Sequence, residues 1–197
     1  MLLVCSPLLT LPAAAQRETE AKAPFIAYLF PAGGQRGQTV EATVSGINLD
    51  GTTAVRVTGA GVKATLVKIV DPKNVQISAV VAPDAELGEH DLRLITANGV
   101  SNRFRFIVGE LPEIKEVEPN SDKNQPQRIE SLPVLVNGQI MEADRDYYRF
   151  AAKAGQTLVC EVQARRLLPF ITGTLRVGNE TTTRFAPAIP IKIIAAE

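Results

Sequence analysis

The chain has 197 residues, enough for one large or two small domains. Its 21 lysines and arginines balance its 21 aspartates and glutamates, which excludes the strongly basic surface expected of a nucleic-acid-binding protein. Hydrophobic residues make up 45% of the chain, alongside 14 glycines, 13 prolines and no tryptophan. This composition is typical of a globular, turn-rich protein and not of a disordered one.

The N-terminal segment is typical of an export signal. Residues 1–15, MLLVCSPLLTLPAAA, form an apolar run that ends in the small residues accepted by signal peptidase. The run is too short to cross a bilayer as a helix, and we expect no stable membrane span. We predict cleavage near Ala15, a flexible polar leader at residues 16–23, and a periplasmic, cell-surface or extracellular location. The basic residues that usually begin a signal peptide are missing directly after Met1. The alternatives are therefore an upstream start or a buried or disordered apolar N-terminus.

The period-two pattern of residues 24–109 is typical of half-buried β-strands. Apolar and polar side chains alternate through Val40–Val44, Val75–Val81 and Phe104–Val108, and turns rich in glycine, proline and asparagine separate these runs. About six or seven short strands at this spacing predict a β-sandwich. No segment shows an amphipathic helical pattern, so the expected fold class is all-β.

Several motifs in this first segment match a known module. They are Pro31, the stretch GGQRGQTVEATVSGINL from Gly33, and the stretch VVAPDAELGEHDLRLITANGVSNRFRFIV that ends at Val108. The segment resembles the immunoglobulin-like, plexin, transcription-factor (IPT/TIG) module, which opens with a glycine-punctuated hairpin and closes with two strands around an asparagine-glycine turn. The resemblance implies an immunoglobulin-like β-sandwich over residues 24–109 that serves as a spacer or an interaction surface.

The second half of the chain begins after a polar, proline-bearing stretch. We interpret residues 110–127 as a linker and acidic segment, and residues 128–197 as a second domain. Strands are expected near Val134–Ile140, Tyr147–Ala151 and Thr157–Gln163. Nearer the C-terminus, TGTLRVG and IPIKIIA are further candidate strands, although the spacing between them is uneven.

Two acidic clusters in this half have the most distinctive chemistry. Glu116, Glu118 and Asn120 are spaced two residues apart, so an extended backbone around the intervening proline places them on one side. Asp144 and Asp146 have the same spacing. Calcium takes about six to eight oxygen ligands from carboxylates, amides and carbonyls, and these five side chains are candidates. The alternative is that they are solvated or that they cap turns.

The sequence around these clusters matches a second known family. The matching residues are Glu116, Glu118, Pro119, Asn120, Gly138, Ile140, Asp144, Asp146, Tyr147, Tyr148, Phe150, Ala154, Gly155 and Gln156. They resemble the bacterial pre-peptidase C-terminal (PPC) domain, a non-catalytic, jelly-roll-like β-sandwich on secreted proteins. Related collagen-binding domains hold calcium in the same two regions. The resemblance therefore implies two consecutive β-sandwiches in this chain and a calcium site at Glu116, Glu118, Asn120, Asp144 and Asp146.

The match to the PPC domain weakens after about residue 167. The family continues with a further strand and a pair of aspartates, whereas no aspartate follows Asp146 in this chain. We therefore expect the second sandwich to be divergent, truncated or frame-shifted beyond that point. A sandwich that lacks its last strands would expose open edges and apolar surface.

The chain shows no pattern typical of a catalytic site. Cleavage of the signal would leave Cys160 as the only cysteine, too few for a disulfide or a zinc cluster, and its alternating neighbours predict a buried core residue. The only histidine, His90, lies at a turn-to-strand junction, where we expect an exposed side chain and not a catalytic base. Sequence motifs of serine hydrolases, zinc peptidases and nucleotide-binding proteins are absent. We therefore expect no enzymatic activity.

These patterns together predict a non-catalytic, secreted binding or accessory module. It would be part of, or derived from, a larger extracellular bacterial protein and would be stabilised by calcium. The expected partner is an extracellular polymer or a protein surface. The alternative is the accessory portion of a secreted peptidase or other hydrolase whose catalytic domain lies outside this sequence.

Overall fold

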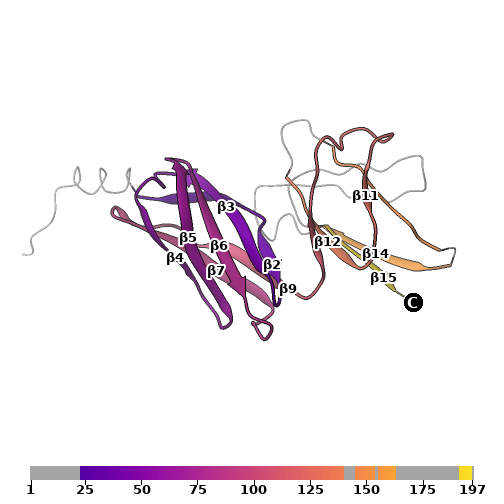
Figure 1. Ribbon diagram of the computed structural model, residues 1–197, viewed down its shortest axis with the longest axis horizontal. Coiled ribbons are helices and arrows are strands. Elements are labelled where there is room, and N and C mark those ends of the chain that lie inside the picture. The colour runs from indigo at the N-terminus through magenta and orange to yellow at the C-terminus, as the bar shows by residue number, and fades with distance from the viewer. Residues whose placement is uncertain (1–22, 140–144, 154, 163–190, 197) are drawn as a thin grey trace, which may run out of the picture.

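The computed structural model describes residues 23–139, 145–153, 155–162 and 191–196 (Figure 1). Within these ranges every regular element is a β-strand, and the strands form several sheets. The all-β, sandwich-type fold predicted from the sequence is therefore confirmed. The described residues include no helix that is both long and apolar enough to cross a membrane.

The first β-sandwich is built from two sheets, drawn mainly in indigo to magenta in Figure 1. One sheet has the strand order β1 (Phe25–Phe30), β3 (Thr39–Ile47), β6 (Asn74–Val81) and β5 (Val62–Asp71). The other has the order β2 (Gly33–Gln35), β9 (Phe104–Gly109), β7 (Gly88–Thr96) and β4 (Thr52–Val57), with β8 (Gly99–Val100) paired to β7.

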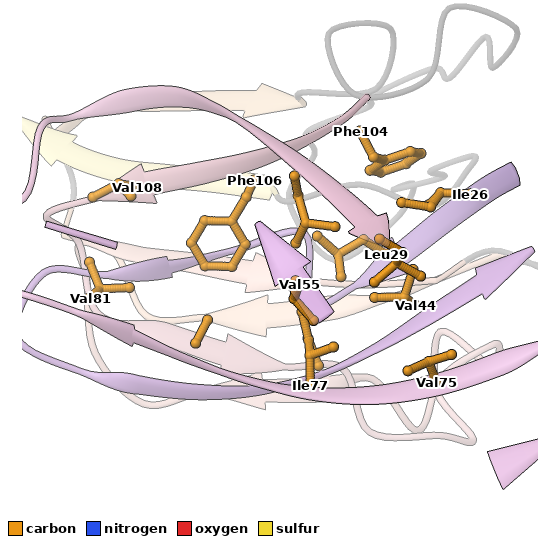
Figure 2. Close-up of a cluster of buried hydrophobic side chains, with 14 of the residues drawn as sticks. Ile26, Leu29, Val44, Val55, Val75, Ile77, Val81, Phe104, Phe106 and Val108 are labelled. Carbon is orange, nitrogen blue, oxygen red and sulfur yellow. The ribbon is translucent and has the colours of Figure 1, made fainter. Parts of the chain in front are cut away.

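The core of this sandwich follows directly from the alternation in the sequence. Val75 and Ile77 of β6 point inward from one sheet, and Leu92 and Phe106 point inward from the other, all of them fully buried. Figure 2 shows Phe106 in the same cluster of buried side chains as Val55, Ile77 and Val81. Burial of each large apolar side chain stabilises the fold by about 1.5–3 kcal/mol, so this cluster is the main source of stability in the first sandwich.

Two glycines of the first sandwich permit close approach of neighbouring backbones. A Cβ atom on Gly46 of β3 would collide with the backbone carbonyl of Phe25, and one on Gly33 would collide with that of Ile107. Gly46 pairs with β1 beside a register shift in that strand. Any larger residue at these positions would separate the paired strands.

The second unit also has two sheets. One has the order β10 (Glu113–Lys115), β12 (Val134–Asn137), β15 (Ile191–Ala196) and β14 (Thr157–Val162), and the other pairs β11 (Gln127–Ile129) with β13 (Tyr148–Phe150). A small core of Ile129, Val134, Val136 and Tyr148 lies between them. Cys160, expected in the core, is half-buried and packs against this cluster.

One segment has a different role from the one expected, and one candidate strand near the C-terminus is confirmed. Residues 110–127 were interpreted as a linker, yet β10 lies within them and pairs in parallel with β12. The candidate strand IPIKIIA is confirmed as β15, which hydrogen-bonds to both β12 and β14. The candidate strand TGTLRVG lies outside the described residues. The linker interpretation was wrong because β10 pairs with a strand about 20 residues further along the chain, and no local pattern encodes this pairing.

Polar contacts link the first sandwich to the second. Arg36 forms an ion pair of 3.0 Å with Glu110, and Lys115 Nζ lies 3.5 Å from the backbone oxygen of Glu41. Beside these contacts is a cleft of ≈ 400 Å³ lined by residues of β2, β3, β10 and β12. The Glu113 carboxylate lines it and accepts a hydrogen bond of 2.9 Å from Asn137 Nδ2. Burial raises the pKa of Glu113, and the Asn137 hydrogen bond partly opposes this rise.

Candidate metal centre

Three carboxylates from two separate segments converge at the edge of the second sandwich. Glu116 and Glu118 follow β10, and Asp146 precedes β13. One oxygen atom from each of the three lies within 4.8 Å of the others. Asp144, the fifth candidate ligand, lies outside the described residues.

Backbone hydrogen bonds hold these two segments side by side. The Glu116 N–H donates to the Asn137 carbonyl across 2.9 Å, which extends the pairing of β10 with β12. The Tyr147 N–H donates to the Asn120 carbonyl across 3.0 Å. We call residues 116–124 the acidic turn. Asp146 is therefore held opposite the acidic turn by main-chain bonds that do not depend on its own side chain.

The Glu116 carboxylate is the centre of a hydrogen-bond network. Its Oε1 accepts bonds from Asn120 Nδ2 at 3.0 Å and from the Tyr148 hydroxyl at 2.8 Å. Its Oε2 accepts a bond of 2.6 Å from the Gln139 backbone N–H. A carboxylate has about four acceptor positions, so these three bonds fix its orientation and leave one position available.

Asn120 is the most buried residue of the acidic turn, with 1% of its surface exposed. Its backbone N–H donates to Glu118 Oε2 across 2.8 Å, and its Nδ2 group donates to Glu116. Its Oδ1 atom is buried and has no hydrogen-bond partner among the described residues. A buried, unsatisfied acceptor costs about 1–3 kcal/mol, so an additional ligand that contacts this oxygen would stabilise the fold.

The Tyr148 hydroxyl lies in an acidic, desolvated environment. Burial is the main cause that raises its pKa, followed by the negative charge of Glu116, the hydrogen bond that it donates to Glu116, and the charge of Asp146. The hydroxyl therefore remains protonated and acts as a donor to Glu116. Nothing in the spacing of the acidic residues indicated this contact, although Tyr148 belongs to the same family motif.

This oxygen set fits the chemistry of a calcium ion. Two ligands that share an ion at about 2.4 Å can be at most about 4.8 Å apart, which is the separation limit that the three carboxylates satisfy. The Asn120 amide, whose Nδ2 group donates to Glu116, lies beside this set and carries a further, neutral oxygen. The candidate ligands include neither nitrogen nor sulfur, the donors that zinc and copper favour.

The expectation that His90 is exposed is wrong. Only 3% of its surface is accessible, because His90 lies on the same buried face of β7 as Leu92 and Leu94. Its Nδ1 lies 2.6 Å from the Thr58 carbonyl oxygen, and its Nε2 lies 2.7 Å from that of Glu86. Both ring nitrogens are therefore engaged with the backbone, and the period-two pattern was the signal that located this residue inside.

Comparisons with known proteins identify no family. No protein-family model and no curated protein sequence matches the chain. One similar structure is the Bacteroides ovatus mixed-linkage glucan utilization locus protein SGBP-B, in complex with a mixed-linkage heptasaccharide. It has 15% identity and a TM-score of 0.36, and the match covers 87% of this chain and 37% of that one.

A second similar structure is that of domains 5–6 of the S-layer protein SbsC. It has 10% identity and a TM-score of 0.31, and the match covers 86% of this chain and 84% of that one. Both TM-scores are too low to assign a family or a function to this chain.

Proposed function

We propose that this protein is a non-catalytic, exported binding or accessory module whose second β-sandwich is stabilised by a calcium ion. Residues 1–15 would serve as its signal peptide, and the module would belong to a larger extracellular bacterial protein. In this proposal the first sandwich is of the IPT/TIG type and the second is a divergent PPC domain. The observation that carries the proposal is the convergence of Glu116, Glu118 and Asp146 beside the buried Asn120 amide.

The calcium ion would be held by Glu116, Glu118, Asn120 and Asp146. It would neutralise three carboxylates that otherwise repel one another, and it would satisfy the buried Asn120 oxygen. Because the ligands come from two segments, the ion would fasten the turn after β10 to the chain that enters β13. Its role would thus be structural.

The assignment to a non-catalytic class is supported by the state of the histidine. His90 is buried, and both of its ring nitrogens face backbone carbonyl oxygens. A general base must reach the proton that it removes, and an imidazole held in this way cannot reach a substrate. The free thiol of Cys160 is half-buried, and burial raises its pKa, which disfavours the reactive thiolate.

The test is thermal unfolding of the full chain with calcium chloride and with a chelator. The chain lacks tryptophan and has three tyrosines, of which Tyr147 and Tyr148 adjoin the site, so near-ultraviolet circular dichroism reports mainly on the second sandwich. Calcium at a hundredfold excess over its Kd should stabilise this sandwich by about 2.7 kcal/mol. The absence of any calcium-dependent shift would refute the metal site.

Two variants distinguish the site from a general effect of charge. Glu118→Gln removes one ligand charge from an exposed side chain and should abolish most of the calcium-dependent shift. Glu130→Gln removes the same charge from an exposed residue outside the cluster and should keep the full shift. Equal shifts in the two variants would show that calcium acts elsewhere.

A further inference from the structure

The exposed face of the sheet β2-β9-β7-β4 has a row of arginines on three neighbouring strands. Arg56 of β4 is the direct cross-strand partner of Arg93 of β7. The register of β7 with β9 pairs Asp91 with Arg105 and Leu92 with Phe104, so Arg103, one residue before β9, falls opposite Arg93. We call Arg56, Arg93 and Arg103 the arginine row.

The side chains of the arginine row are on the solvent side of the sheet. Their neighbours Val55, Leu92, Leu94 and Phe104 are buried, and alternation therefore directs the arginines outward. Arg56 and Arg103 are exposed, and Arg93 is half-buried. Nη1 of Arg93 donates a hydrogen bond of 3.0 Å to the Ser101 carbonyl, which restrains the guanidinium at the centre of the row.

The carboxylates on this face leave two arginines of the row, Arg56 and Arg93, without an ion pair among the described residues. Glu89 pairs with Arg105 at 3.0 Å, outside the row, and Asp91 forms a longer ion pair of 3.8 Å with Arg103. Among the described residues, no carboxylate oxygen lies within 4.0 Å of Arg56 or Arg93. Like charges directly opposite each other in an antiparallel pair destabilise the sheet, so the row has a cost that a bound anion would remove.

An apolar strip runs beside the arginine row. Ala54 of β4 pairs with Ile95 of β7, and Ile95 pairs with Val100 of β8. On β4 and β7 these aliphatic residues lie two positions from Arg56 and Arg93, on the same face of the sheet. Val100 is 54% exposed. The face therefore offers a line of guanidinium groups next to a line of aliphatic side chains.

We infer that this face binds a linear acidic polysaccharide with a carboxylate on most of its sugars. Neighbouring strands are about 5 Å apart, whereas same-face carboxylates of an extended acidic peptide are about 7 Å apart. A pyranose ring is closer in length to the strand spacing. Carboxylates would take bidentate bonds from the arginine row, and the C–H faces of the sugars would pack on Ala54, Ile95 and Val100. The inference rests on the binding role proposed above and names its ligand class.

Binding of polygalacturonate to the full chain tests the inference. Calorimetry should be performed without added calcium, because this polymer binds calcium itself. From the energies of exposed ion pairs, Arg56→Gln should weaken binding about threefold and Arg56→Gln with Arg93→Gln about tenfold. The matched control Lys63→Gln removes an exposed positive charge from β5, in the other sheet, and should leave the affinity unchanged.

Further measurements distinguish between classes of ligand, and they separate the test of this inference from the test of the proposed calcium site. Binding should weaken as salt increases, and dextran, a neutral polymer, should not compete. Equal affinity for poly-glutamate would overturn the choice of a polysaccharide. No binding of polygalacturonate, or an equal loss in Lys63→Gln, would overturn the site. Neither of these outcomes would bear on the proposed calcium site. That site is tested separately, by measuring calcium-dependent stabilisation of the same protein.

A last measurement excludes a purely structural role for the row. Thermal unfolding of Arg56→Gln without ligand should show a midpoint equal to or above that of the parent protein, because the variant relieves repulsion with Arg93. A clearly lower midpoint would indicate that Arg56 supports the sheet and would count against the inference.

Discussion

The hydroxyl of Tyr148 donates a hydrogen bond of 2.8 Å to the Glu116 carboxylate, across 32 positions of sequence. It joins the first residue of β13 to the turn after β10, the same two segments that supply the candidate calcium ligands. The acidic cluster is therefore organised by a neutral donor from the small core and does not depend on its carboxylates alone. This network can be tested with or without a metal ion.

Replacement of Tyr148 with phenylalanine should destabilise the second sandwich by about 1–3 kcal/mol, because Glu116 would lose a buried hydrogen bond. The change keeps the ring in the core and removes only the hydroxyl. Urea unfolding followed by near-ultraviolet circular dichroism measures the loss. Tyr147→Phe removes the neighbouring, half-buried hydroxyl and is the control. Equal losses in the two variants would contradict the role of the Glu116 bond.

The same hydroxyl predicts a loss of stability at alkaline pH. Burial and the nearby carboxylates raise the pKa of Tyr148 in the folded state above its unfolded value of about 10. Its contribution is fully present below pH 10 and is lost progressively above it, because the unfolded chain ionises more readily. Thermal midpoints between pH 8 and pH 11 should fall more steeply for the parent protein than for Tyr148→Phe.

Replacement of Asn120 with alanine should affect the calcium-bound protein most. The variant removes the buried Oδ1 atom, and in the chelated protein this removal partly compensates for the lost bond to Glu116. With calcium present a ligand is lost as well, so the difference in melting temperature between calcium and chelator should shrink. Asn124→Ala, in the same turn but exposed, should keep this difference. An unchanged difference in Asn120→Ala would exclude this oxygen as a ligand.

The cleft-lining Glu113 predicts a pH dependence of its own. Its folded-state pKa is raised above the ordinary value of 4.5, so protonation is favoured by folding. Its contribution to stability is fully present below pH 4.5 and is lost as the pH rises through the raised pKa. Glu113→Gln should therefore raise the thermal midpoint at pH 7, since the amide oxygen can still accept from Asn137. Glu41→Gln, an exposed residue of the same cleft, should leave the midpoint unchanged.

Gly46 tests the close packing of β1 against β3. Gly46→Ala should destabilise the first sandwich by about 1–3 kcal/mol or more, because the new methyl group meets the backbone carbonyl of Phe25. Gly109→Ala adds the same methyl group where the nearest atom, Glu113 Oε1, is 3.9 Å away, and should have little effect. Chemical unfolding of both variants provides the comparison, and equal stability would contradict the strand spacing.

The amino-acid sequence by itself determined the strands of the first sandwich and the face that each of them buries. Val75, Ile77 and Phe106 lie inward because side chains alternate along any strand, whatever its partner is. Applied consistently, the same rule would have placed His90 inside. The sequence also marked candidate oxygen ligands, through residue type and spacing within short segments: Glu116, Glu118, Asn120, Asp144 and Asp146.

Only the tertiary structure decided which of these segments meet. The pairing of β10 with β12, the place of β15 between β12 and β14, and the contact of Tyr148 with Glu116 join residues far apart in the chain. The opposition of Arg56 and Arg93 likewise exists only through the register of β4 with β7. A periodic pattern specifies the face of a strand, but its neighbour and register depend on the packing of the whole fold.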